Sequence, residues 1–195
     1  MLKIVQFPHP TLRHRSKPLR RVDQKIKEIV AEMFELMYAA KGVGLAANQV
    51  GLPFQLFVVN TAGDPLSGEE LVFINPILSS PQGQATAEEG CLSLPGVFGN
   101  VVRAERIHVA AYDRSGQVID RTIDDMLARV IQHEFDHVQG VMFFERMNPL
   151  ELKLITSDLD RFEREFEMRR LSGEIPPDDQ IIAERNEWEK RYCAP

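Results

Sequence analysis

Apolar residues recur at helical spacing in three stretches of the chain, and this pattern predicts three helices. The first stretch follows Asp23, a favoured N-cap residue, and predicts a helix over residues 24–41. The second predicts a helix over residues 125–138. The third opens at Asn148-Pro149, with proline at the first helical position. Its apolar stripe has the spacing of a helix that buries one face, and consists of Leu152, Ile155, Leu159, Phe162 and Phe166.

Short apolar runs bounded by proline and glycine lie between the first two helices and predict β-strands. They cover residues 54–60, 70–75, 107–112 and 118–123, and the last two flank an Asp-Arg-Ser-Gly turn, which predicts a hairpin. The stretch around Cys91 is rich in glycine and small residues and is interpreted as a loop. Together these patterns predict an α+β fold. Mostly antiparallel β-sheets pack around the central helix, with one further helix towards each end of the chain.

The chain has 195 residues, 44% of them hydrophobic, which is enough for one domain with a substantial core. We expect this main domain to cover residues 1–173. Residues 174–195 are polar and net acidic, and form a C-terminal extension. The extension is expected to be either disordered or partly helical around residues 181–192.

The formal net charge of −6 argues against a chain-wide basic surface, so no sequence-specific nucleic-acid partner is expected. Lysine and arginine interrupt residues 1–21, which therefore lack the apolar stretch of a signal peptide. No apolar run approaches the roughly 20 residues that span a bilayer. The sequence therefore predicts no membrane partner and a cytoplasmic location.

The strongest chemical signal is the motif His-Glu-Phe-Asp-His at residues 133–137, on the second predicted helix. Residues four apart share a helix face, so His133 and His137 can bind one metal ion. Glu134 lies beside them and can handle the proton of a water molecule at the ion. The alternative is a charged helix with two unrelated histidines.

Such a site needs a third ligand, and several residues compete for the role. Longer zincin motifs supply a downstream histidine, but the corresponding residue here is Phe143. Glu163 has a workable spacing, yet it lies on the polar side of the third predicted helix. Cys91 is a candidate because a cation displaces the proton of a thiol. Alternatively, Cys91 is a small buried hydrophobe, or forms a disulfide with Cys193.

The segment from Gly42 to Gln49 reads Gly-Val-Gly-Leu-Ala-Ala-Asn-Gln. Its two glycines let another backbone or a ligand approach closely. The Gln49 amide can donate a hydrogen bond to a developing oxyanion. The alternative is a helix cap at Gly42 followed by a tight loop.

Taken in order, Gly-Val-Gly-Leu-Ala-Ala-x-Gln, Glu-Gly-Cys-Leu-Ser and Gln-His-Glu-x-Asp-His resemble the three signature motifs of peptide deformylases. The resemblance covers roughly residues 1–170, and implies that residues 1–173 form a catalytic domain of this family. The site residues that it implies are the metal ligands Cys91, His133 and His137, the general acid/base Glu134, the oxyanion donors Gln49 (side chain) and Leu92 (backbone N–H), and the substrate-backbone contacts Val43 and Gly44.

Further features of the site follow from the same resemblance. Glu89 and Arg103 resemble a supporting ion pair near the metal. Some family members carry an arginine shortly after the cysteine motif that meets the peptide, but here residues 96–99 read Gly-Val-Phe-Gly, so that contact is not expected. The first substrate side chain should enter an apolar pocket. Its candidate walls share the face of the second helix or lie in the glycine-rich segment, and are Val43, Met126, Val130 and the His133 ring.

The resemblance implies a metal-dependent hydrolase that removes the N-formyl group from the N-terminal formylmethionine of newly synthesised polypeptides and releases formate. Its partners would be N-formyl-methionyl nascent peptides, with the ribosome as a further candidate. Ligand chemistry alone favours zinc over ferrous iron. The resemblance instead implies one divalent ion, with Fe²⁺ preferred and Zn²⁺ or Ni²⁺ as substitutes.

Two other functions compete with this interpretation. A true metallopeptidase would share the His-Glu-x-x-His helix, but Phe143 and the cysteine motif argue against it. A structural metal or interaction module would need four protein ligands, and only three can be named.

Overall fold

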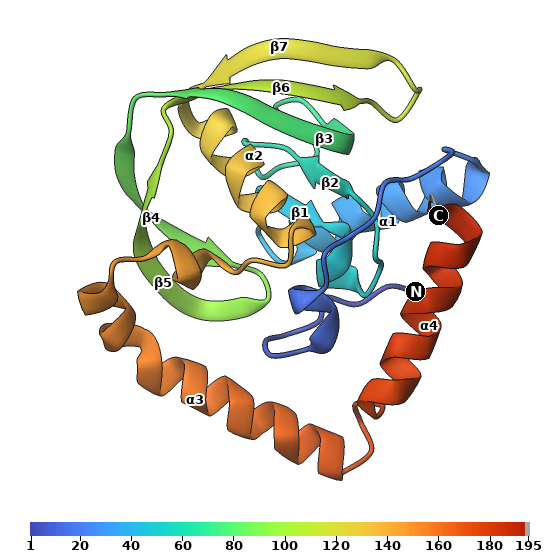
Figure 1. Cartoon of the computed structure of the whole chain (residues 1–195), viewed down its shortest axis with the longest axis vertical. Coiled ribbons are helices and arrows are strands. Elements are labelled where there is room, and N and C mark those ends of the chain that lie inside the picture. Colours follow the sequence, from blue (N-terminus) through green and yellow to red (C-terminus); the bar gives the residue numbers. More distant parts are fainter. Residues whose placement is uncertain (194–195) are drawn as a thin grey trace.

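Helix α2 (Asp125–Val138) lies at the centre of the molecule, with antiparallel sheets around it (Figure 1). The structure is a computed structural model and describes residues 1–193. Helices near both ends of the chain complete the fold, so the predicted α+β class and its central helix are confirmed. No helix in the described residues is long and apolar enough to cross a membrane.

Five strands form the larger sheet in the order β1-β2-β3-β6-β7. The predicted hairpin is confirmed, with Tyr112 opposite Val118 at its tip. Strand β1 lies at one edge of this sheet, and α2 packs against β1 and β2. The strand bounds are β1 Gly44–Ala46, β2 Leu56–Val59, β3 Leu71–Gln82, β6 Arg106–Tyr112 and β7 Val118–Asp124.

Strand β3 is longer than predicted because two prolines do not end it. The predicted strand stopped at residue 75, before Pro76, whereas β3 continues past Pro76 and Pro81 to Gln82. The register of the pairing with β6 shifts once across each proline, between Ile74 and Ile77 and between Ser79 and Gln82. Such bulges allow a residue without an N–H to remain in a strand.

The interpretation of the stretch around Cys91 as a loop is wrong. This stretch forms a second, two-stranded sheet of β4 (Ala85–Cys91) and β5 (Leu94–Arg103). Three consecutive residues of β4 are exposed, and the buried positions of β5 do not alternate strictly along its whole length. The period-2 pattern that reveals a half-buried strand is therefore missing, and only the pairing of the two strands in space defines them.

Helix α1 (Gln24–Ala39) begins as predicted and ends two residues early. The Asp23 side chain accepts a hydrogen bond from the N–H of Ile26, as expected of an N-cap. At the other end, the left-handed residue is Lys41 (φ 56°), so Gly42 is not the residue that turns the chain. The Gly42 N–H still closes the helix by donating to the carbonyl of Met37.

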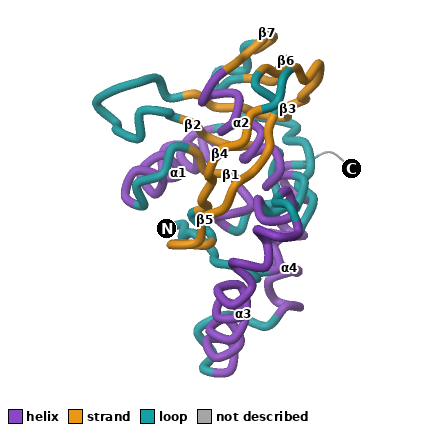
Figure 2. Tube along the Cα trace, turned by 90° about the vertical axis from the view of Figure 1, so that its left-hand side faces the viewer, coloured by secondary structure: helices purple, strands orange, loops and turns teal. Residues whose placement is uncertain are grey.

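Helices α3 (Pro149–Leu171) and α4 (Asp178–Tyr192) follow α2 and lie away from β6 and β7 in both views (Figures 1 and 2). Helix α3 starts at the predicted Asn148 cap. Residues 178–192 of the C-terminal extension form α4, so for the described residues the disordered alternative is wrong and the partly helical one is confirmed. Tyr192 is fully buried and packs with Trp188 against Phe54, which anchors α4 in the main core.

Candidate metal and catalytic site

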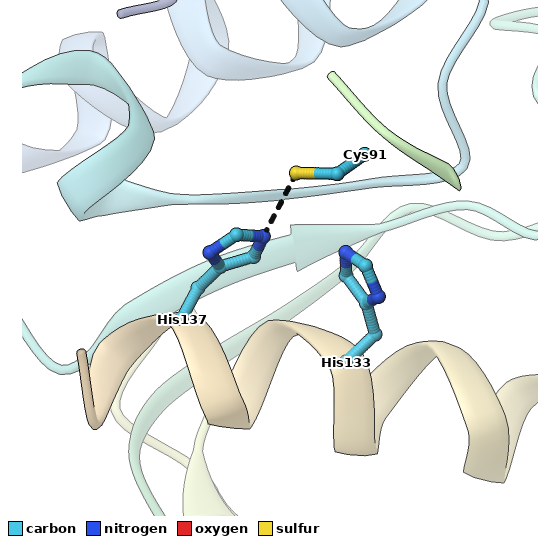
Figure 3. A group of neighbouring side chains, drawn as sticks. All are labelled: Cys91, His133 and His137. Atoms are coloured by element: carbon cyan, nitrogen blue, oxygen red, sulfur yellow. Dashed lines mark hydrogen bonds between the residues drawn. The ribbon is translucent and has the colours of Figure 1, made fainter. Parts of the chain in front are cut away.

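The three predicted metal ligands lie together in the interior (Figure 3). His133 and His137 project from one face of α2, and Cys91 reaches them from the end of β4. One ligand atom from each residue lies within 4.8 Å of the other two, and the Cys91 Sγ is 3.2 Å from the His137 Nε2. Both cysteines are free, and Cys193 lies against the backbone of Lys17, so the disulfide alternative is wrong.

The other candidate ligands lie elsewhere. Glu163 is exposed on α3 and does not belong to the cluster. Phe143, which occupies the position of the third zincin histidine, stacks on the His133 ring with centroids 6.2 Å apart. It therefore packs beside the histidine rather than offering a donor atom.

The orientation of His133 is fixed from behind by Glu89. The His133 Nδ1 lies 3.0 Å from the Glu89 Oε2, which leaves the other ring nitrogen for a metal. Arg103 binds both oxygens of Glu89 at 3.0 Å, which confirms the predicted ion pair. Burial by itself raises the pKa of Glu89, but the hydrogen bonds from His133 and Arg103 lower it to about 2. Glu89 is therefore a permanent anion beside the ligand.

Three members of this charged network, Asp136, Arg146 and Arg129, were missed by the sequence analysis. Asp136, inside the helix motif, binds Arg103 from β5 and Arg146 after α2. Arg129 donates to Glu89 at 2.7 Å. Its spacing, four residues before His133 on α2, is the signal by which the sequence could have placed it on the site's face.

Glu134 is buried, and its Oε2 has no hydrogen-bond partner in the described part of the chain. Burial raises its pKa to about 7, although the neighbouring His133 acts in the opposite direction. A carboxyl group with this pKa exchanges a proton readily near neutral pH. A Cβ on Gly44 would lie 2.4 Å from the Glu134 Oε1, so only glycine there leaves room for the carboxylate.

Gln49 directs its amide N–H groups towards the cysteine. It lies in the 3-10 turn Ala47–Val50, and its Oε1 accepts a hydrogen bond from the N–H of Ala46 at 2.8 Å. That contact turns the Nε2 to within 3.4 Å of the Cys91 Sγ. Leu92 follows Cys91 in the turn between β4 and β5, and a Cβ on Gly42 would lie 2.6 Å from its side chain. The glycine-rich segment is therefore pressed against both the cysteine turn and Glu134.

A cavity of about 920 Å³ opens in front of these groups. Of the predicted substrate contacts, Val130 is buried in its wall and Met126 stands at an exposed position, while Gly44 at the start of β1 and Val43 just before it also line the cavity. No other strand in the described residues pairs with the free edge of β1, which leaves backbone groups there for an extended peptide.

The irregular N-terminal segment ties the three motif segments together through its backbone. The N–H of Val5 donates to the carbonyl of Gln49 at 2.8 Å, and that of Phe7 to the carbonyl of Ser93 at 2.9 Å. Further along, the N–H of Ser16 donates to the carbonyl of Val138 at the end of α2. One segment thus fixes the relative positions of the oxyanion donor, the cysteine turn and the histidine helix.

The residues present fit a divalent metal ion. Burial by itself lowers the pKa of His133, but hydrogen bonds to Cys91 and Glu89 raise it to about 10. Burial and the nearby His133 hold the pKa of His137 well below its ordinary value. A cation competes with protons for such atoms, and one sulfur with two imidazole nitrogens is a donor set that suits zinc and iron. The unpartnered Glu134 oxygen supplies a further polar group at the same place.

Comparisons with known proteins agree with this site. The family model described as polypeptide deformylase matches residues 1–153. A peptide deformylase of Rhodopirellula baltica is 44% identical over 191 residues, covering 98% of this chain and 95% of the relative. Peptide deformylase 1B of Arabidopsis thaliana, described as chloroplastic/mitochondrial, is 40% identical over 167 residues, or 85% of this chain and 61% of the relative.

Solved structures of peptide deformylases are similar to this chain in fold. The crystal structure of a plant peptide deformylase, PDF1B, superposes with a TM-score of 0.85 at 38% sequence identity, covering 91% of this chain and 95% of the plant chain. Sequence similarity and fold similarity therefore extend over the same residues that build the site. The chain belongs to the polypeptide deformylase family.

Proposed function

We propose that this site removes the formyl group by metal-assisted hydrolysis, with each group in the role its position supports. Membership of the family makes the chain a peptide deformylase, an amide hydrolase that acts on the formylated N-terminus of new polypeptides. The observation that carries the mechanism is the cluster of Cys91, His133 and His137 beside the unpartnered carboxylate of Glu134. In the proposal, the first three residues bind the metal and Glu134 is the acid/base.

Each step can be assigned to a residue. A divalent ion bound by the three ligands supplies Lewis acidity, which makes a water molecule more acidic and polarises the formyl carbonyl. Glu134 takes the proton of the attacking water and delivers it to the leaving amine. The Gln49 amide and the Leu92 backbone N–H donate to the oxyanion as the carbonyl becomes tetrahedral. Formate and a free N-terminus are released.

Selectivity for formyl follows from the tight contacts of Gly42 and Gly44. Side chains at these positions would collide with Leu92 and Glu134, which supports a narrow space around the reacting carbon. A bulkier acyl group would have to occupy that space. The methionine side chain enters the cavity along Val43, Met126 and Val130, while the peptide backbone runs beside Val43 and Gly44.

The proposal extends to the domain organisation, the location and the partners of the chain. All groups with a proposed chemical role lie in residues 1–173, whereas the described part of the extension, residues 174–193, contributes packing. The bacterial relative supports a cytoplasmic location. N-formyl-methionyl nascent peptides are the substrates, and the ribosome that carries them is the proposed partner. Cell fractionation and co-sedimentation with ribosomes would test these statements.

Formate release from formyl-Met-Ala, with metal content measured on the same sample, tests the function. We expect turnover that requires about one metal ion per chain, and no cleavage of an N-blocked peptide at internal bonds. Cleavage of internal bonds would favour the metallopeptidase. Stoichiometric metal without turnover of either substrate would favour the structural module.

We expect Fe²⁺ to be the native ion, and air to inactivate the iron enzyme. The cavity lined by Cys91 and His133 gives oxygen a path to the site, and both ferrous iron and the Cys91 thiolate are oxidisable. The same protein loaded with Ni²⁺ should keep its activity several times longer, because Ni²⁺ does not oxidise in air. Aerobic half-lives of the two forms, measured side by side, check this expectation. Equal half-lives would contradict the assignment of iron as the native metal. They would not contradict the deformylase activity.

A further inference from the structure

Arg129 joins three parts of the site that the proposed roles leave separate. It lines the substrate cavity from α2, and its side chain is 12% exposed. Its Nη1 donates to the Glu89 Oε1 at 2.7 Å and to the carbonyl of Val101 on β5 at 3.0 Å. Its Nη2 donates to the carbonyl of Ala85 on β4 at 2.6 Å. One guanidinium therefore connects the central helix to both strands of the small sheet.

Arg129 is the third side chain that binds the Glu89 carboxylate. Arg103 donates to both of its oxygens, and His133 meets the Oε2. Arg103 is itself drawn towards Asp136 on α2, so it is shared between two carboxylates. Arg129 is the second partner of the Oε1 and approaches from the cavity side.

We propose that Arg129 is a positioning residue for the metal ligands. By holding Glu89, it fixes the ring of His133. By binding the backbone of β4 and β5, it holds the strand that carries Cys91 against the helix that carries both histidines. The separation between the sulfur and the imidazole nitrogens is then set from the wall of the substrate cavity. This inference rests on the proposed metal ligands.

Two substitutions separate the positioning role from simple packing. Arg129→Met removes all three hydrogen bonds and keeps an unbranched side chain. Arg129→Lys keeps a donor for Glu89, but a single ammonium lacks the planar fork that also serves two carbonyls. Arg106→Met is the matched control, because Arg106 pairs with Asp124 on the exposed side of β6, away from Glu89.

The measurements are Zn²⁺ affinity of the metal-free protein by chelator competition, the visible spectrum of the Co²⁺ form, and the melting temperature. Losing a hydrogen-bond partner of a ligand typically costs about 10–100-fold in metal affinity. Because Arg129 contacts Glu89 rather than a ligand itself, we expect Arg129→Met to lose zinc affinity towards the lower end of that range, about 10-fold, with an altered cobalt spectrum and a lower melting temperature. Arg129→Lys should recover most of the affinity and the spectrum while its melting temperature stays low. The control should match wild type in affinity and spectrum.

The inference is overturned if Arg129→Met binds zinc with wild-type affinity and an unchanged cobalt spectrum. It is also overturned if Arg129→Lys lowers the zinc affinity as much as Arg129→Met does. Retaining a donor to Glu89 would then make no difference, and the effect would be structural only. Should Arg129→Met fail to fold, Arg129→Lys decides by the same criteria. Failure of the proposed ligand set looks different, since Cys91→Ala would then bind zinc as tightly as the unaltered chain.

Discussion

Glu134→Gln is expected to fold and load metal normally and to lose about 10²–10⁴-fold in kcat. The amide has nearly the shape of the carboxylate but cannot take a proton from water. The structure supports a specific effect, because Glu134 is buried with a free oxygen and a pKa raised to about 7 by burial. It lies against Gly44 and not in the cluster of ligand atoms.

The measurement is formate release under saturating formyl-Met-Ala, with metal content and melting temperature of the same preparation. Glu163→Gln is the matched control, since this glutamate is exposed on α3 and should leave kcat unchanged. If Glu134→Gln turns over near the wild-type rate with a full complement of metal, Glu134 is not the acid/base. The hydrolytic mechanism would then fail, although the family assignment would stand.

Cys91→Ala is expected to lose metal and activity together. The sulfur is one of three donors, and its removal deletes a ligand rather than a partner of a ligand. The loss of metal affinity should therefore exceed the roughly 10–100-fold cost of disturbing a ligand's hydrogen bond. Added metal in large excess should restore only part of the formate release.

Cys193→Ala is the natural control for this substitution. Cys193 is also a buried free thiol, but it lies at the end of α4, in contact with backbone oxygens of Lys17 and Pro53. Its removal should affect the melting temperature and leave metal content unchanged. A Cys91→Ala protein that retains stoichiometric metal after dialysis would refute the proposed ligand set.

The contrast between Glu134→Gln and Cys91→Ala separates catalysis from metal binding. Glu134 acts through its proton, so its replacement should leave the metal in place. Cys91 acts through its sulfur, so its replacement should remove the metal. A similar result from both variants would mean that the division of roles between the helix and the cysteine turn is wrong.

Features that depend on residues close together in the chain could be predicted from the sequence. The Asp23 and Asn148 caps were readable because an N-cap side chain bonds to an N–H two or three residues away. The shared face of His133 and His137 was readable because four residues make about one helical turn. A short turn between two apolar runs likewise predicted the hairpin of β6 and β7.

Features that depend on partners far apart in the chain became visible only in the folded molecule. The sequence left Cys91 with three roles, and the approach of β4 to α2 selects one place for it, 3.2 Å from the His137 Nε2. Strands β4 and β5 carry no regular apolar alternation along their whole length, and they are held in place by hydrogen bonds with Arg129 and Asp136 on α2 and by packing against α3. Arg129 belongs to the site only because Glu89, 40 residues earlier, meets it there. Short sequence patterns predict local hydrogen bonds, because both partners lie within a few residues of each other. Burial and long-range charge pairing depend on how the whole chain packs.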